Sequence, residues 1–152
     1  MSFFLHGCSS DNTEELIGGY FYRDEGVNTK DILCHLSNRK GIYSKVTAYD
    51  YNADFIVAVQ QPTYEEYKTM VGFNLRDNLK KYPTNSSEES VQSEKEADSI
   101  LKHDPYYKSI FAHKINYWII VNKSEEVLGP LAKVEYQSKR TDLNIPENIE
   151  VK

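Results

Sequence analysis

Two apolar runs, Phe55–Gln60 (FIVAVQ) and Asn116–Val121 (NYWIIV), decide the fold that this sequence predicts. Successive side chains of a strand point to opposite faces of a sheet, so a continuously apolar strand has to bury both faces. Such a strand belongs in the centre of a sheet rather than at its edge. We therefore expect both runs to be central strands, with 116–121 lying beside or near 55–60.

Further strands are predicted on either side of these runs, at 20–23, 30–37, 42–51 and 126–128. Short turns rich in Asn, Asp and Gly separate the upstream strands from one another. Short strands joined by short turns are typical of an antiparallel meander. The sequence therefore predicts an α+β fold built on an antiparallel sheet of about five or six strands.

Two helices are expected to cover this sheet. Apolar residues recur every three or four positions from Tyr64 to Tyr82, which places them on one face of a helix. Thr63 and Glu66 have the spacing of a capping box at its start. A second helix is predicted at 133–143, and we expect both helices to pack on one face of the sheet.

A helical insertion at 86–113 is predicted before the last strands. Its first part is mostly polar, which indicates an exposed helix. Asp104 is a candidate N-cap for a second short helix, because Pro105 suits the first helical position.

The length of 152 residues is that of a single domain. We expect a lipobox remnant and flexible tether at 1–17, one α+β domain at 18–146, and a C-terminal tail at 147–152.

Composition and charge argue against several classes of protein. The formal net charge of −5 lacks the basic excess that a nucleic-acid binder uses to displace counterions. No window approaches the roughly 20 apolar residues of a membrane-spanning helix, so we expect no embedded transporter or channel. Two cysteines provide neither a disulfide framework nor a four-thiolate zinc site.

The N-terminus carries a motif that indicates where the protein is located in the cell. Leu5–Cys8 (LHGC) resembles a bacterial lipobox, in which a cysteine follows a small residue and an aliphatic residue stands three positions earlier. Cys8 would carry the lipid anchor. Acyl chains hold a protein on a bilayer because each buried methylene contributes about 0.8 kcal/mol. Only Phe3–Leu5 remains of an apolar signal, so this interpretation requires a leader upstream of Met1 or one that has been trimmed. The alternative is a short cytosolic N-terminus with a chance Gly-Cys pair.

No combination of residues predicts catalysis or metal binding. His35, His103 and His113 lack the i, i+4 spacing of a helical metal pair and belong to no Cys/His cluster. Cys34 and His35 are neighbours on a predicted strand, so their side chains point to opposite faces. The sequence also lacks a Gly-x-Ser-x-Gly elbow, a P-loop and a dinucleotide fingerprint. We therefore expect no enzymatic activity and no cofactor.

Twelve tyrosines are the one unusual count in the composition. Tyrosine combines an apolar body with a polar tip, which suits recognition surfaces and also the rim of a small domain. Two interpretations stay open: ordinary core and rim packing, or a patch that binds a ligand or partner. The candidates for such a patch are Tyr20, Tyr22, Tyr43, Tyr49 and Tyr51.

Short motifs in both halves of the chain lead to a resemblance. They are Gly18–Tyr20, Asp50–Asn52, Phe55–Ala58, Tyr117–Ile120, Gly129–Leu131, Tyr136, Arg140, Leu143 and Ile145–Pro146. In this order they resemble a family of uncharacterised bacterial lipoproteins, a domain of unknown function typical of Bacteroidetes and low-GC bacteria. The resemblance implies a secreted, lipid-anchored domain of unknown activity, and it transfers no catalytic residues.

The chain departs from the pattern of that family at three positions. Val121 stands where an aspartate is usual, and Val134 where an acidic residue is frequent. Ala132 replaces a hydroxyl residue that often caps the last helix, a change that costs about 1 kcal/mol of capping energy. These changes concern local stability more than function.

Together these features predict a membrane-anchored domain that faces outside the cytoplasm and binds a protein or small molecule without chemistry. Its membrane partner would be reached through the lipid on Cys8, and nucleic acid is not expected as a partner. The alternatives are a cytosolic interaction or immunity-type protein, and an enzyme with a dispersed, unrecognised site.

Overall fold

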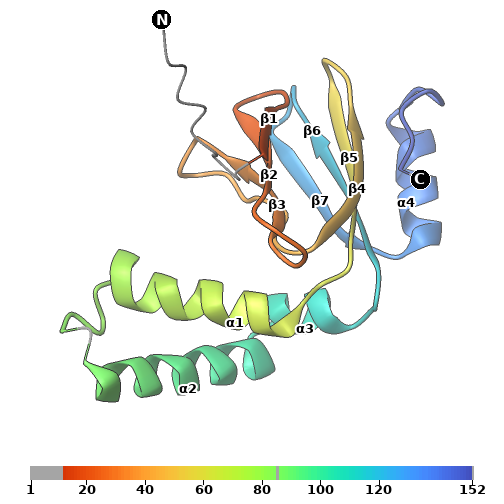
Figure 1. The fold of residues 1–152 in the computed structure, drawn as a ribbon. Helices are drawn as coiled ribbons and strands as arrows, with labels where there is room; N and C mark the ends of the chain where they lie inside the picture. Colours follow the sequence, from red (N-terminus) through yellow and green to blue (C-terminus); the bar gives the residue numbers. More distant parts are fainter. Residues whose placement is uncertain (1–11, 85, 152) are drawn as a thin grey trace, which may run out of the picture.

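The computed structural model describes residues 12–84 and 86–151. Its elements, in chain order, are β1 (Asn12–Glu15), β2 (Tyr20–Asp24), β3 (Lys30–Cys34), β4 (Val46–Tyr51), β5 (Phe55–Gln60), α1 (Tyr64–Phe73), the π-helix η1 (Asn74–Asn78), α2 (Ser87–His103), α3 (Pro105–Phe111), β6 (Asn116–Val121), β7 (Glu126–Leu131) and α4 (Lys133–Asp142) (Figure 1). The predicted α+β class is confirmed, and so is the helical insertion before the last strands. None of the helices in these residues combines the length and apolar character needed to cross a bilayer.

The strands form two antiparallel sheets rather than the single predicted one. β1, β2 and β3 make a three-stranded sheet, and β4 to β7 make a four-stranded sheet in sequence order. The stretch predicted as one strand at 42–51 takes part in both. Ile42 bridges to Ile32 at the edge of the first sheet, whereas β4 begins at Val46 and pairs with β5 in the second. Ser44, between these two pairings, is buried and donates its hydroxyl to Asp31.

Both apolar runs are central strands, as predicted. β5 and β6 pair along their whole length, with Phe55 opposite Val121 and Gln60 opposite Asn116. Ile56 and Trp118 face a first hydrophobic core, while Val57 faces a second core on the other side of the sheet. The strands therefore bury both faces.

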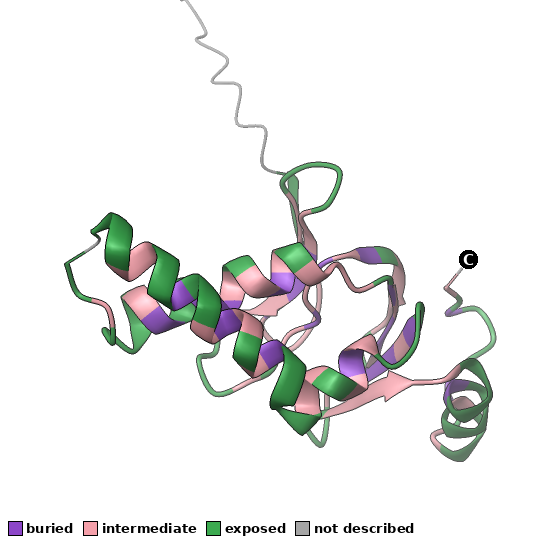
Figure 2. Ribbon diagram, turned by 90° about the horizontal axis from the view of Figure 1, so that it is seen from below, coloured by how far each residue is buried: buried purple, intermediate pink, exposed green. Residues whose placement is uncertain are grey.

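The two cores are covered by different elements. The first core is shared with the three-stranded sheet and with α1, α2 and α3, and the second with α4 and the C-terminal segment (Figure 1). The prediction that the helices at 64–82 and 133–143 lie on one face is wrong. Tyr67 of α1 belongs to the first core and Tyr136 of α4 to the second. A sheet that is apolar on both faces needs a cover on each, and the two helices divide that task. The outer side of α2 is exposed, whereas most residues of α1 are buried or half-buried (Figure 2).

Two predicted boundaries need correction. The predicted tether at 1–17 includes β1, whose four residues pair with β2 from Asn12–Asp24 to Glu15–Phe21. The predicted tail at 147–152 is part of the fold: Ile149 is buried in the second core, and the Glu150 N–H donates to the Asp50 carboxylate over 3.1 Å. Asn12–Glu15 and the C-terminal segment have few apolar residues, so the sequence pattern did not reveal their packing.

The helix starts follow the predicted caps only in part. Asp104 caps α3 by accepting the Tyr106 N–H over 2.8 Å, with Pro105 at the start of the helix. Thr63 makes no side-chain cap at α1. At α4 the Glu135 carboxylate accepts the Ala132 N–H over 2.8 Å, which satisfies one helix-end donor where the capping hydroxyl is missing.

A buried polar hub joins the end of β5 to three other parts of the chain. The Gln60 amide nitrogen donates to the Tyr43 carbonyl over 2.8 Å and to the Tyr67 hydroxyl over 2.6 Å. The Gln60 amide oxygen accepts from Trp118 Nε1 over 3.0 Å and from Asn116 Nδ2 over 3.1 Å. An indole N–H only donates and a backbone carbonyl only accepts, so these partners fix which end of the amide points which way.

Replacing Gln60 by leucine should cost at least about 2 kcal/mol of unfolding free energy, because a similar volume would leave several buried polar groups unpaired. Urea unfolding of Gln60→Leu against the natural protein measures this. Gln61→Leu is the matched control: its side chain is exposed, and a change within about 0.5 kcal/mol is expected. Equal stability of the two variants would mean that the hub does not hold the fold together.

Candidate functional site

The five tyrosines predicted as a patch do not form one surface. Tyr20 is only 2% exposed and donates its hydroxyl to the Lys40 carbonyl over 3.0 Å. Burial raises the pKa of Tyr20 to about 12. Tyr20 is therefore a core residue and not part of a binding patch. The sequence could not show this burial, because it does not reveal that the second sheet covers the face of β2 that carries Tyr20.

Three of the remaining tyrosines lie where the two sheets meet. The rings of Tyr22 and Tyr49 are 4.5 Å apart, and both pack against the first core. Tyr51 donates to Glu14 over 3.1 Å, and the Tyr49 hydroxyl donates to the same carboxylate. A hollow of about 440 Å³ lies beside Tyr22 and the outer edge of β4. These contacts join β1 to β4 across the two sheets.

Tyr43, the fifth predicted residue, belongs to a different place. Together with Tyr67, Tyr106 and Tyr107 it lines a groove of about 550 Å³, with Lys40 and Asp104 at its rim. We call this surface the tyrosine groove. Its side chains come from the chain between β3 and β4, from α1 and from the start of α3.

The four rings are arranged as a succession of near-perpendicular pairs. Tyr43 meets Tyr67 at 5.4 Å and 76°, Tyr67 meets Tyr107 at 6.1 Å and 78°, and Tyr107 meets Tyr106 at 5.2 Å and 72°. Edge-to-face contacts are the arrangement that aromatic quadrupoles favour. Tyr67, which is buried, lies in the middle of this succession.

The hub around Gln60 holds two members of the groove. The Gln60 amide donates both to the Tyr67 hydroxyl and to the Tyr43 carbonyl, so one side chain positions a ring from α1 and the backbone beneath another ring. Gln60, at the end of a central strand, thereby fixes the position of Tyr67, which forms the floor of the groove.

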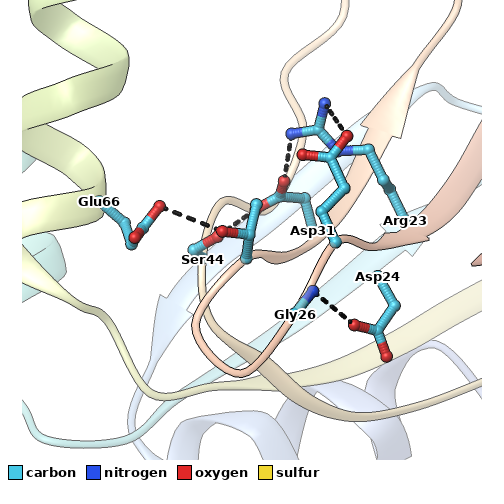
Figure 3. Close-up of polar contacts among 8 residues, drawn as sticks. Arg23, Asp24, Gly26, Asp31, Ser44 and Glu66 are labelled. Carbon is cyan, nitrogen blue, oxygen red and sulfur yellow. Dashed lines mark hydrogen bonds and ion pairs between the residues drawn. The ribbon is translucent and has the colours of Figure 1, made fainter. Parts of the chain in front are cut away.

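A second buried network holds the segment that carries Tyr43. Asp31 is fully buried, and its carboxylate lies between Arg23 and Ser44 (Figure 3). Arg23 donates to one carboxylate oxygen over 2.6 Å, and the Ser44 hydroxyl donates to the other. A buried carboxylate is stabilised only when it is paired and hydrogen-bonded, and here both conditions hold. Ser44 follows Tyr43 directly, so this network restrains the position of the ring.

Opposite charges lie at the rim of the groove. The Lys40 ammonium lies over the ring of Tyr106, with Nζ 4.6 Å from the ring centre. Asp104 accepts the Tyr106 N–H over 2.8 Å and leaves the rest of its exposed carboxylate at the rim. A ligand in the groove would therefore meet apolar ring surfaces and one charge of each sign.

Burial raises the pKa of tyrosine hydroxyls in the groove above the ordinary value of about 10. It raises the pKa of Tyr43 to about 12, with a smaller contribution from the negative charge of Asp31. Burial likewise raises the pKa of Tyr106 and of Tyr107. At neutral pH these hydroxyls are hydrogen-bond donors and acceptors rather than bases, which suits binding better than proton abstraction.

Other candidate residues are placed as follows. His35 stacks on Phe21 with ring centres 4.4 Å apart, and its Nε2 lies 2.9 Å from the Glu15 carboxylate. Cys34 is a free thiol, 3.9 Å from the Gly18 carbonyl. Within residues 12–84 and 86–151, no group of three or more His, Cys, Asp and Glu side chains is arranged to hold a metal ion. Cys8, the predicted lipid attachment site, lies outside the described residues.

Tyr67 falls within the predicted apolar stripe from Tyr64 to Tyr82, and neither Tyr106 nor Tyr107 was a candidate for the patch. The one local signal was the adjacent pair Tyr106–Tyr107, which follows the predicted helix cap at Asp104 and the helix-starting Pro105. Nothing in the spacing along the chain indicates that this pair meets Tyr43 and Tyr67.

Tyr43 should ionise near pH 12, well above the ordinary value of about 10. Because the pKa is raised in the folded state, its contribution to stability is present below about pH 10 and is lost as pH rises towards 12. When the pH is raised from about 9 to about 11, the unfolding free energy of Tyr43→Phe should therefore fall by less than that of the natural protein. Urea unfolding at both pH values measures this, with ¹³Cζ NMR of labelled tyrosine to follow the ring directly. Ionisation of Tyr43 near pH 10 would contradict the buried position.

Comparison with known proteins adds one finding. A family model described as Protein of unknown function (DUF3997) matches residues 20–152, which include the tyrosine groove, both cores and the C-terminal segment. Neither the curated proteins nor the solved structures contain a match. The expectation of an uncharacterised family is confirmed, while the lipid anchor predicted at Cys8 lies ahead of the matched residues and stays a prediction. The chain belongs to the DUF3997 family of proteins of unknown function.

Proposed function

We propose that this protein is a lipid-anchored domain of the cell envelope that faces outside the cytoplasm, where it binds a ligand or partner without performing chemistry. The single observation that carries the proposal is the lipobox-like Leu5–Cys8, with Gly7 before the cysteine and Leu5 three positions ahead of it. Cys8 would take the acyl chains, and two or more chains give stable anchoring.

Cys8 precedes the first strand by only a few residues in the sequence. β1 begins at Asn12, four residues after Cys8. A fully extended chain of four residues reaches at most about 14 Å. An anchor at Cys8 would therefore hold β1 close to the membrane surface.

The tyrosine groove supports the binding part of the proposal. Ligand sites are concave and mostly apolar, with a few polar groups that fix orientation. Four tyrosine rings with Lys40 and Asp104 at the rim meet this description. The hydroxyls of Tyr43, Tyr106 and Tyr107 are uncharged at neutral pH and can donate and accept hydrogen bonds.

Radiolabelled palmitate should label the natural protein in a bacterial host when it is expressed with a lipoprotein leader fused ahead of Leu5. Cys8→Ser should abolish labelling, because no thiol then follows Gly7. Cys34→Ser is the matched control, since Cys34 is the only other cysteine, and it should be labelled like the natural protein.

Protease treatment of intact spheroplasts tests the location in the same strains. The labelled protein should be digested from outside, whereas a protein that stays undigested and unlabelled would overturn the proposal. That outcome would favour a cytosolic interaction or immunity-type protein instead. Labelling that persists in Cys8→Ser would remove Cys8 as the attachment site.

A further inference from the structure

One cation already lies on a ring of the tyrosine groove. The Lys40 ammonium is 4.6 Å from the centre of the Tyr106 ring. The face of an aromatic ring carries partial negative charge and attracts cations, and it does so most strongly where water is excluded. The groove therefore presents at least one ring face to a positive charge.

We infer that the tyrosine groove binds small ligands that carry a trimethylammonium group, such as choline or glycine betaine. The inference rests on the binding role proposed above for the groove and does not depend on the lipid anchor.

The arrangement of the rings favours a rounded cation over a flat ligand. Each ring stands at 72–78° to the next, from Tyr43 through Tyr67 and Tyr107 to Tyr106. Neighbouring rings at these angles do not offer the coplanar platform that stacking of a flat ligand needs. A trimethylammonium group is nearly spherical and apolar at its surface, so it needs no such platform and can contact more than one ring. Its charge is spread over the methyl groups, and little hydration is lost on entry.

The rim charges define the rest of the ligand. The Asp104 carboxylate adds a negative charge beside Tyr106 and favours a cation in the groove. Lys40 favours a negative group on the same ligand, and it must leave the Tyr106 ring when the ligand enters. The carboxylate of glycine betaine would provide a new partner for the displaced ammonium, while choline would not.

The groove is held in shape before any ligand arrives. Gln60 fixes the Tyr67 hydroxyl and the Tyr43 carbonyl, and Asp31 fixes Ser44 next to Tyr43. Side chains that are already ordered lose less conformational entropy on binding. The apolar side chains of Leu33 and Met70 complete the lining and would contact the methyl groups.

Isothermal titration calorimetry of the full Met1–Lys152 chain tests the inference with choline, glycine betaine and 3,3-dimethylbutan-1-ol. The alcohol has the shape of choline but no charge, so it separates cation binding from apolar packing. We expect choline to bind at least about tenfold more tightly than the alcohol, and betaine more tightly than choline. Equal affinity for choline and the alcohol, or no binding of any probe, would overturn the inference.

Ring variants locate the site. Tyr106→Leu should lower choline affinity about tenfold, while Tyr106→Phe keeps the ring and should stay within about threefold. Lys40→Gln should raise choline affinity severalfold, because the competing internal ammonium is gone, and Lys123→Gln in the β6–β7 turn is its control with no effect expected. Urea unfolding confirms that each variant is folded. Choline binding that Tyr106→Leu leaves unchanged would place the site elsewhere and overturn the assignment.

Lipid vesicles test whether the trimethylammonium group is supplied by a lipid headgroup. Binding of free choline together with binding to phosphatidylcholine vesicles, but not to phosphatidylglycerol vesicles, would identify a lipid headgroup as the source. The two proposals fail separately: loss of palmitate labelling leaves choline affinity unchanged, and loss of choline binding leaves labelling unchanged.

Discussion

The hydrogen bonds of one buried amide, that of Gln60, hold the centre of this structure together. Its position at the end of β5 lets it accept from Trp118 and Asn116 of the neighbouring strand and donate towards α1 and the chain before β4. A buried amide without partners would be costly, so the four contacts restrain one another. The tyrosine groove is a consequence, since its floor at Tyr67 and the backbone of Tyr43 both depend on this amide.

The two-sided central sheet explains the rest of the architecture. β5 and β6 are apolar on both faces, so one face needs the three-stranded sheet with α1 to α3, and the other needs α4 with the C-terminal segment. Glu14 links the sheets at their other end by accepting from Tyr49 and Tyr51. The groove lies where the connection between β3 and β4 meets α1 and α3, so three separate segments contribute rings to one surface.

The sequence predicts those parts of the fold whose energy comes from local apolar patterns. The runs at β5 and β6, the α+β class and the helical insertion follow from apolar patterns together with turn residues and helix caps. β1 has no apolar side chain, and its pairing with β2 comes from backbone hydrogen bonds that no pattern records. The alternation through Ile42, Ser44 and Val46 is continuous, so it cannot reveal that the chain passes there from one sheet to the other. Of the groove, only Tyr43 was a candidate, because its partners are brought to it by tertiary packing.

NMR of the Gln60 side-chain amide tests the central claim most directly. If the hub holds the molecule together, the Gln60 amide protons show nuclear Overhauser contacts to the Tyr67 ring, and the Trp118 indole proton, which donates to the same amide, exchanges slowly with solvent. Rapid exchange of the Trp118 indole proton, with no contact between Gln60 and Tyr67, would contradict the account.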